Sequence, residues 1–206
     1  MDHTIVSYCT IQDNLVHKNG ELYFQGDSRD FNQFSELLYK FTGISYPKFY
    51  KMDNLCKLGL LASDILLKSN DLLNNTAPEK TGVILSNKSS SLDTDLRYNR
   101  MVRSGIPSPA VFVYSLPNIV IGEICIRNGI KGENTFFISA TYEIQSQVNY
   151  INQLFENDVF DVCIGGWLEL LENSYKAFLY LAIKDEPEPG KLVHTEETIK
   201  ILYHKV

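Results

Sequence analysis

Short apolar segments alternate along this chain with segments in which apolar residues recur every three or four positions, and that alternation constrains the fold most. Four apolar segments are strand candidates: TIVSYCTI near the start, TGVILSN at 81–87, DVCIGG at 161–166 and AFLYLAI at 177–183. Between them, the spacing of apolar residues predicts amphipathic helices, for example over 53–66 and 144–155. We therefore expect an α/β domain with helices on both faces of a mixed sheet.

Turn and capping residues indicate where the N-terminal elements begin and end. Asn19-Gly20 lies between alternating apolar residues in LVHKNGELYF, a pattern that predicts a β-hairpin. Ser28 is expected to cap a helix that ends at Gly43, because hydroxyl side chains favour the first position and glycine the last. Asp53 is expected to cap the next helix.

The composition limits the classes of partner. The chain has 206 residues, of which 44% are hydrophobic, enough for one globular domain with a substantial core. Its net charge of −6 and its lack of basic clusters argue against nucleic acid or an anionic membrane surface as the main partner. No apolar run is long enough to span a bilayer, so we expect a cytoplasmic protein.

The cysteines and histidines do not form a recognisable site. Cys9, Cys56, Cys125 and Cys163 are widely scattered, so we interpret them as buried small hydrophobes rather than metal ligands or disulfides. The four histidines lie near the two ends of the chain, far in sequence from its centre. No metal and no cofactor are expected.

One central segment, KGENTFFISATYEIQSQ, resembles the place where enzymes mount a nucleophile. A β-prone run at 135–139 is followed by a turn at Ala140-Thr141 and then by a helix. A helix N-terminus stabilises an anion through its dipole and free amides. The turn offers only the hydroxyls of Ser139 and Thr141, and neither has an evident base beside it in the sequence.

Five short motifs follow one another at nearly ungapped spacing. They are Lys51-Met52-Asp53, Thr81-Gly82, Ser108-Pro109, Asn118 with Gly122, and Asp161 with Gly165 and Glu169. In this order the chain resembles the N-terminal half of the β-ketoacyl-(acyl carrier protein) synthases, the condensing enzymes of the thiolase-like fold. The resemblance covers roughly residues 50 to 170. It implies a three-layer α-β-α half of that fold, a single β-ketoacyl synthase N-terminal-like domain over 1–206.

The resemblance fails at the nucleophile. In the family a cysteine at this turn takes the acyl chain, and its position corresponds to Thr141, after Ser139 and Ala140. A threonine hydroxyl is a far poorer nucleophile than a helix-activated thiol. The family's other catalytic groups belong to a C-terminal half that has no counterpart in this sequence. The resemblance therefore implies no catalytic residue, and a binding surface at Asn118, Ser139, Ala140 and Thr141.

Three functional hypotheses follow. The first is a non-condensing accessory protein of fatty-acid or polyketide-type biosynthesis that acts through a full-length ketosynthase or an acyl carrier protein. The second is an enzyme, an acyltransferase or hydrolase that uses Thr141 or Ser139 with a base supplied across an interface. The third is an acyl-binding module. The missing thiol favours the first.

An interface is expected at the strand before the turn. In the family this strand lies at the dimer interface, which here implies contacts through Thr135, Phe136, Phe137 and Ile138 and a homodimer. The strand is short, β-prone and uncharged, so an open edge would invite aggregation. The alternative is an internal strand covered by the chain itself. The polar side of the following helix, which includes Gln147, is expected to be solvated or to dock a partner.

Overall fold

An eight-stranded mixed sheet runs through the computed structural model, which describes residues 2–28, 30–185 and 187–205. The strands are β1 (Thr4–Gln12), β2 (Leu15–Lys18), β3 (Glu21–Gln25), β4 (Thr81–Asn87), β5 (Asn134–Ile138), β6 (Val162–Leu171), β7 (Ser174–Ile183) and β8 (Leu192–Val193). Their order is β3-β2-β1-β7-β6-β4-β5, and β8 pairs with β1 outside this path. β5 is therefore at one edge of the sheet and β3 at the other.

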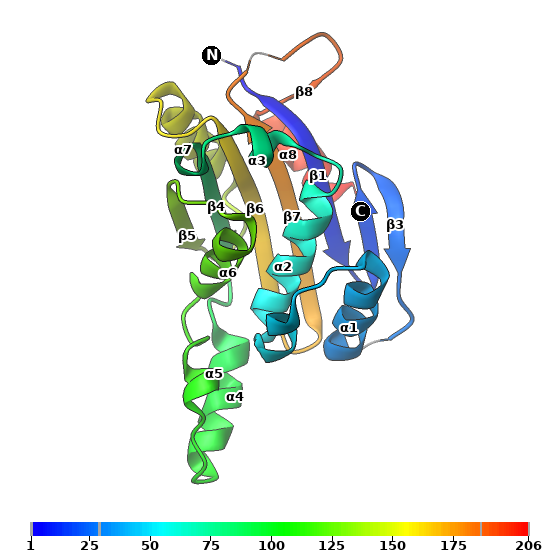
Figure 1. Ribbon diagram of the computed structural model, residues 1–206, viewed down its shortest axis with the longest axis vertical. Coiled ribbons are helices and arrows are strands. Elements are labelled where there is room, and N and C mark those ends of the chain that lie inside the picture. The colour runs from blue at the N-terminus through cyan, green and yellow to red at the C-terminus, as the bar shows by residue number, and fades with distance from the viewer. Residues whose placement is uncertain (1, 29, 186, 206) are drawn as a thin grey trace.

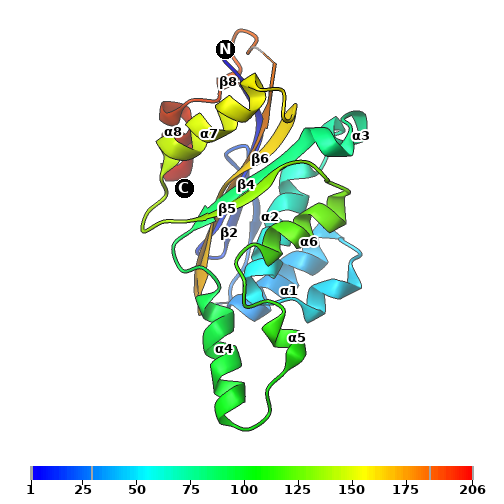
Figure 2. The same cartoon turned by 90° about the vertical axis from the view of Figure 1, so that its left-hand side faces the viewer.

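Helices cover both faces of the sheet, as the alternation of segments predicts (Figures 1 and 2). They are α1 (Phe31–Thr42), α2 (Asn54–Leu67), α3 (Leu72–Asn75), α4 (Leu92–Arg103), α5 (Pro109–Phe112), α6 (Ile119–Asn128), α7 (Ile144–Glu156) and α8 (Glu196–His204). Figure 2 shows α1, α2 and α6 on one face and α7 and α8 on the other. The α4–α5 pair extends beyond the sheet as an arm at one end of the molecule.

The strand β4 is buried along its whole length. It pairs in parallel with β6 on one side and with β5 on the other. Such a strand has no solvent face, which explains why its sequence is a nearly continuous apolar run rather than an alternating one. On the far side of β6, the antiparallel strands β7, β1 and β2 complete the sheet.

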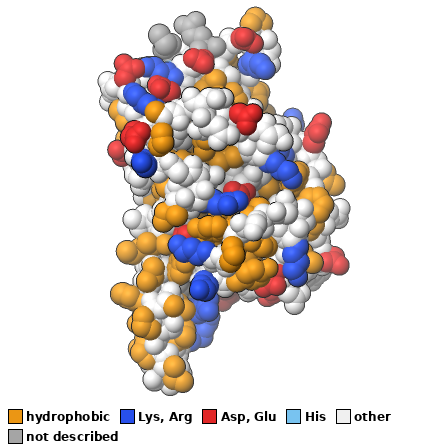
Figure 3. Space-filling view, viewed as in Figure 1, with side chains coloured by type: hydrophobic (Ala, Val, Ile, Leu, Met, Phe, Trp, Pro, Cys, Tyr) orange, Lys and Arg blue, Asp and Glu red, His pale blue; other side chains and the backbone are white. Residues whose placement is uncertain are grey.

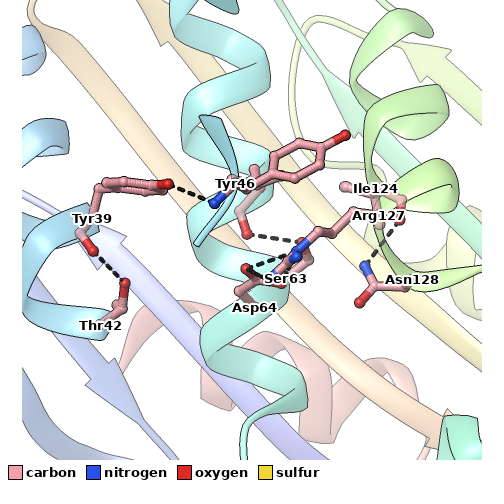
Figure 4. Close-up of polar contacts among 9 residues, drawn as sticks. Tyr39, Thr42, Tyr46, Ser63, Asp64, Ile124, Arg127 and Asn128 are labelled. Carbon is pink, nitrogen blue, oxygen red and sulfur yellow. Dashed lines mark hydrogen bonds and ion pairs between the residues drawn. The ribbon is translucent and has the colours of Figure 1, made fainter. Parts of the chain in front are cut away.

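The helix α2 packs on the sheet between α1 and α6 and is buried over most of its length. Gly59 permits this approach, because a Cβ atom there would lie 2.3 Å from the side chain of Val120 on α6. The two helices are also joined by an ion pair in which the Arg127 guanidinium binds the Asp64 carboxylate at 3.2 Å. That guanidinium lies over the ring of Tyr46, so the segment before α2 is held in the same cluster (Figure 4).

The predicted turns and caps are mostly confirmed. Asn19 and Gly20 adopt the left-handed conformations of a tight hairpin turn, with φ of 53° and 85°. Asp53 caps α2 by accepting a hydrogen bond from the Cys56 amide. The prediction for Ser28 is wrong, because Asp30 caps α1 instead. The Ser28 hydroxyl lies one turn earlier and accepts a hydrogen bond from the Asp30 amide.

Two buried histidines lie under α7 and the segment before α8. His194 is 2% exposed and lies 2.6 Å from the Asn152 amide oxygen and 3.2 Å from the Tyr180 hydroxyl. Burial, and to a lesser degree the neighbouring His3, lowers the pKa of His194 from 6.5 to about 3. Burial also lowers the pKa of His3. Both imidazoles are therefore neutral in the folded protein at pH 7.

This burial makes stability depend on pH. Below pH 6.5 the unfolded chain binds a proton at His194 that the folded chain rejects until about pH 3, so stability falls as the pH falls through that window. We expect a loss of up to about 1.4 kcal/mol per pH unit from this imidazole. In the variant His194→Gln, denaturant unfolding between pH 6 and 4 should show a flatter pH dependence, with the remaining slope due to His3 and to buried carboxyl groups such as Asp53 and Asp64. The control His204→Gln, at an exposed position, should match the wild type, and an unchanged slope in His194→Gln would contradict the assignment.

Candidate functional site

The turn between β5 and α7 brings Ser139 and Thr141 together at the edge of the sheet. The Ser139 amide donates to the carbonyl of Asn87 at 3.0 Å, which extends the β4–β5 pairing by one residue. The Ser139 hydroxyl then donates to the Thr141 carbonyl at 2.7 Å and closes the turn. Thr141 itself is exposed, two residues before the cap of α7. The Thr141 side chain is thus accessible to solvent.

A carboxylate that the sequence analysis missed lies beside this hydroxyl. The Thr141 Oγ1 donates to Oε1 of Glu143 at 2.8 Å. The expectation that neither hydroxyl has a base beside it is therefore wrong, because the turn folds two neighbouring side chains onto each other. Glu143 is exposed to water, however, where a carboxylate is too weak a base to remove a hydroxyl proton near neutral pH.

The N-terminus of α7 supplies the anion-stabilising feature that the sequence predicts. Glu143 is its cap residue, but no side chain bonds the first free amides. Those amides and the helix dipole favour a negative charge at the turn. They would stabilise a thiolate or an oxyanion, but they do not make a threonine hydroxyl ionise. The turn therefore favours an anion but holds no thiol or other side chain that ionises readily.

A cavity of about 190 Å³ adjoins the turn. Its lining combines apolar Phe137 and Ile138 with Ser86, Ser139 and Gln147. Pockets that enclose a small-molecule ligand are usually at least about 300 Å³, so this one cannot hold an acyl chain together with its carrier arm.

Behind the cavity, Gln147 is buried, which corrects the prediction that it belongs to the outer polar side of α7. Its amide nitrogen donates to the Gly166 carbonyl at 3.1 Å, and its amide oxygen accepts from Tyr142 at 2.6 Å. The Tyr180 hydroxyl also donates to that oxygen and connects it to His194. Burial raises the pKa of Tyr142 and of Tyr180, so the network stays neutral. Its role is to hold α7 on the sheet.

Asn118 lies apart from this network. It begins α6, on the face of the sheet opposite α7 (Figure 2). In the described part of the chain, its side chain makes no hydrogen bond to the turn at 139–141. The structure thus brings Ser139, Ala140 and Thr141 together but does not join Asn118 to them.

A second, larger cavity of about 880 Å³ lies between the start of α2 and the α4–α5 arm. Four cationic residues line it: Lys51, Lys57, Arg97 and Arg100. None of them forms an ion pair with another described residue. Lys57 is only 8% exposed, and its ammonium lies 5.5 Å from the centre of the Phe49 ring.

Two of the three carboxylates that line the same cavity, Asp53 and Asp93, already accept hydrogen bonds within the fold, and the third belongs to Glu172. Asp53 accepts from the Cys56 amide at 3.0 Å and from the Thr94 hydroxyl at 2.6 Å. Asp93 accepts from the Glu172 amide at 2.8 Å and from the Asn54 side chain at 3.3 Å. These bonds position α2 and α4 and leave the cations available, so the cavity suits an anionic ligand or partner.

Three of the four cysteines are buried, and we interpret these three as structural. Cys9, Cys56 and Cys163 are buried, whereas Cys125 is half-buried, contrary to its predicted place in the core. Burial raises the pKa of Cys9 to about 12 and that of Cys125 to about 11. All four side chains are therefore protonated at neutral pH, and none lies in the turn at Thr141.

Within 2–28, 30–185 and 187–205, no group of three or more histidine, cysteine or acidic side chains is arranged to hold a metal ion. None of the helices in these ranges is both long and apolar enough to cross a membrane.

Comparison with known proteins identifies the fold. No protein-family model matches the chain, and no curated protein matches it in sequence. Among solved structures, it is similar to the ishigamide ketosynthase/chain length factor (TM-score 0.67, 16% identity, 92% of this chain and 64% of that one). It is similar to a chain from a ketosynthase in complex with its chain length factor from Xenorhabdus doucetiae (TM-score 0.59, 10% identity, 98% and 90%).

A third similar structure is a type II polyketide synthase acyl-carrier protein in complex with its ketosynthase (TM-score 0.61, 14% identity, 88% of this chain and 62% of that one). The chain thus has the thiolase-like fold of ketosynthases, and the predicted α/β class is confirmed. It spans less than two thirds of the first and third of these structures but most of the second.

The nucleophile position can be tested by acyl transfer. After incubation with an acyl-CoA thioester, we expect no adduct on Thr141 or Ser139 of the wild type by peptide mass spectrometry, because no base ionises either hydroxyl. In Thr141→Cys, the thiol at the start of α7 should be acylated about tenfold or more faster than any native cysteine. An adduct on wild-type Thr141 would contradict this reading and favour the acyltransferase or hydrolase hypothesis, with Glu143 as its base.

Proposed function

From the ketosynthase fold of this chain, we propose that it is a non-condensing accessory subunit of fatty-acid or polyketide-type assembly, comparable in role to a chain length factor. It acts by pairing with a full-length ketosynthase that supplies the thiol. One observation carries the proposal: an open sheet edge lies directly before the turn at which a threonine stands in place of the expected nucleophile.

The open edge is β5. Its backbone is bonded to β4 on one side only, and its outer side faces solvent. Phe137 and Ile138 are 40% and 50% exposed. The strand has no lysine, proline or bulge, the usual devices that keep an exposed edge from pairing. Such an edge favours a partner strand, and the family resemblance implies the equivalent strand of a ketosynthase.

The α4–α5 arm adds apolar surface to the same side of the molecule. Ile106, Phe112 and Leu116 are 72%, 58% and 59% exposed. Figure 3 shows hydrophobic side chains gathered over this arm, and Figures 1 and 2 place it at the end of the side that carries β5. A stable interface buries about 800 Å² per partner, more than a five-residue strand provides. The arm would therefore extend the apolar surface that the strand offers to a partner.

The interface is tested with a ketosynthase encoded beside this chain. Co-expressed, the two should elute as one complex, and Ile138→Lys should abolish it because the partner strand would bury a lysine. Ile201→Lys on α8, where Ile201 is 59% exposed, is the matched control and should leave the complex intact. Circular dichroism checks that both variants fold. Equal complex formation by the two variants would contradict a β5 interface.

Without a ketosynthase, we expect the same edge to pair two copies of this chain. Light scattering of the wild type at tens of micromolar, compared with that of Ile138→Lys, distinguishes that homodimer from a monomer.

Alone, the protein should yield no 3-oxoacyl product from acyl- and malonyl-carrier protein. Product above a no-protein control would contradict a non-condensing role.

The cationic cavity favours an acyl carrier protein as a second partner. A carrier protein bears its acyl group on a phosphate-containing arm, and Lys51, Lys57, Arg97 and Arg100 offer unpaired charges for that phosphate or for acidic side chains. Because such contacts are partly exposed, their contribution is expected to weaken with salt.

We expect Arg97→Glu with Arg100→Glu to weaken carrier-protein binding by about tenfold or more, measured by titration calorimetry at low salt. Arg103→Glu lies on the same helix but outside the lining of the cavity and is the matched control. Similar affinities for the double variant and the control would exclude this surface while leaving the β5 interface untouched.

A further inference from the structure

A small cavity of about 80 Å³ lies on the part of the sheet farthest from β5, between β1, the β2–β3 turn and the end of α8. It is lined by Tyr8, Thr10, His17, Gly20 and Lys205. The strand register places Thr10 opposite His17. Tyr8 is two residues before Thr10, so all three side chains project from the same face of the sheet.

Two buried polar atoms in this cavity have no hydrogen-bond partner among the described residues, the Thr10 Oγ1 and the His17 Nδ1. Thr10 is only 1% exposed. An unpaired polar atom at such a depth costs free energy, so proteins nearly always satisfy it with another group, a water or a ligand. Both atoms belong to residues that line the cavity, which makes it a candidate site for a group that bonds to both.

Gly20 keeps this space open. Its φ is 85°, and a Cβ atom there would lie 2.8 Å from the Tyr8 hydroxyl oxygen and 3.8 Å from the Lys205 Nζ. Glycine therefore serves two purposes at this position: it completes the hairpin turn, and it leaves the tyrosine hydroxyl and the lysine ammonium facing the cavity.

The positive charge and the hydrogen-bond donors around the cavity favour an anionic ligand. Lys205 contributes an ammonium that forms no ion pair with a described residue, and among these residues no carboxylate belongs to the lining. Burial raises the pKa of Tyr8, so its hydroxyl remains a hydrogen-bond donor at neutral pH. Thr10 donates as well, and His17 donates in either its Nδ1 tautomer or its charged form. Donors thus converge without a competing negative charge.

We propose that this cavity binds a small oxyanion of the size of inorganic phosphate. Its volume equals that of about two or three waters, which is too small for a nucleotide or an acyl chain. The anion would accept hydrogen bonds from Tyr8, Thr10 and His17 and pair with Lys205. It would join the β1–β2 hairpin to the end of α8, independently of the proposed partner interfaces.

The test is a phosphate titration of the full chain, followed through the His17 imidazole by NMR at constant ionic strength. We expect a saturable shift for His17 and none for the exposed His204, which serves as an internal control. Lys205→Met and Thr10→Val should each weaken phosphate binding by about tenfold or more. Lys200→Met, an exposed position on the same helix with the same loss of charge, should bind as the wild type does.

A second measurement does not depend on assigning the imidazoles. Bound phosphate should raise the melting temperature of the wild type and of Lys200→Met, but not that of Lys205→Met. Sodium acetate and sodium chloride at the same ionic strength are the controls, because a general effect of salt would raise the melting temperature with these salts as well. A His17 resonance that does not respond to phosphate, or equal responses in Lys205→Met and Lys200→Met, would show that the cavity holds only water.

Discussion

The burial of β4 between two parallel strands determines the geometry of the functional edge. Because both of its neighbours run parallel to it, their carboxyl ends meet at the same end of the sheet. The pairing of Asn87 with Ile138 fixes where β5 stops, and the next hydrogen bond, from the Ser139 amide, fixes the start of the turn. The position of Thr141 at the N-terminus of α7 follows from that register.

Glycines make this arrangement possible. A Cβ at Gly82 of β4 would lie 2.4 Å from the Phe160 ring, and one at Gly132 would lie 2.4 Å from the Thr81 carbonyl oxygen. At Gly166 of β6 it would lie 2.0 Å from the Phe178 carbonyl oxygen. Two of the motifs that connect the sequence to the ketosynthases, Thr81-Gly82 and the element around Gly165, are therefore packing requirements of the sheet and not chemistry.

This distinction explains what the sequence could predict. The alternation of apolar runs and periodic segments predicts the class of fold, and the hairpin at Asn19-Gly20, the cap at Asp53 and the strand before Thr141 are local patterns that the structure confirms. The inference that Thr141 stands at the position of the family's thiol comes from the sequence alone and stays a prediction. Local patterns succeed where neighbours in sequence are neighbours in space.

The features that were missed depend on contacts between distant segments or on rotamers. Gln147 looks polar and outward on a helical wheel, but the Gly166 carbonyl and two tyrosines give its amide enough partners to be buried. His194 follows β8, far from Tyr180 in sequence, and meets it only through the fold. The Thr141–Glu143 contact depends on how the turn closes, and the exposure of the α4–α5 arm depends on where the sheet ends.

Three features support one proposal: the helix N-terminus at the turn, the absence of a thiol there and the open strand beside it. In the proposed account, this chain would contribute a sheet edge, an apolar arm and a cationic cavity to an assembly in which another subunit performs condensation. The buried network around Gln147 holds α7 in place so that the edge is presented as a rigid surface. A stand-alone acyl-binding module is less consistent with a cavity of about 190 Å³ at the turn.

Hydrogen–deuterium exchange with and without a co-purified ketosynthase tests this account most directly. If a partner strand pairs with β5, the backbone amides of 134–138 that do not bond to β4 should exchange about tenfold or more slowly in the complex. The exposed edge of β3, at the other side of the sheet, should be unchanged. A stable complex in which β5 exchanges as fast as in the free chain would contradict the central claim.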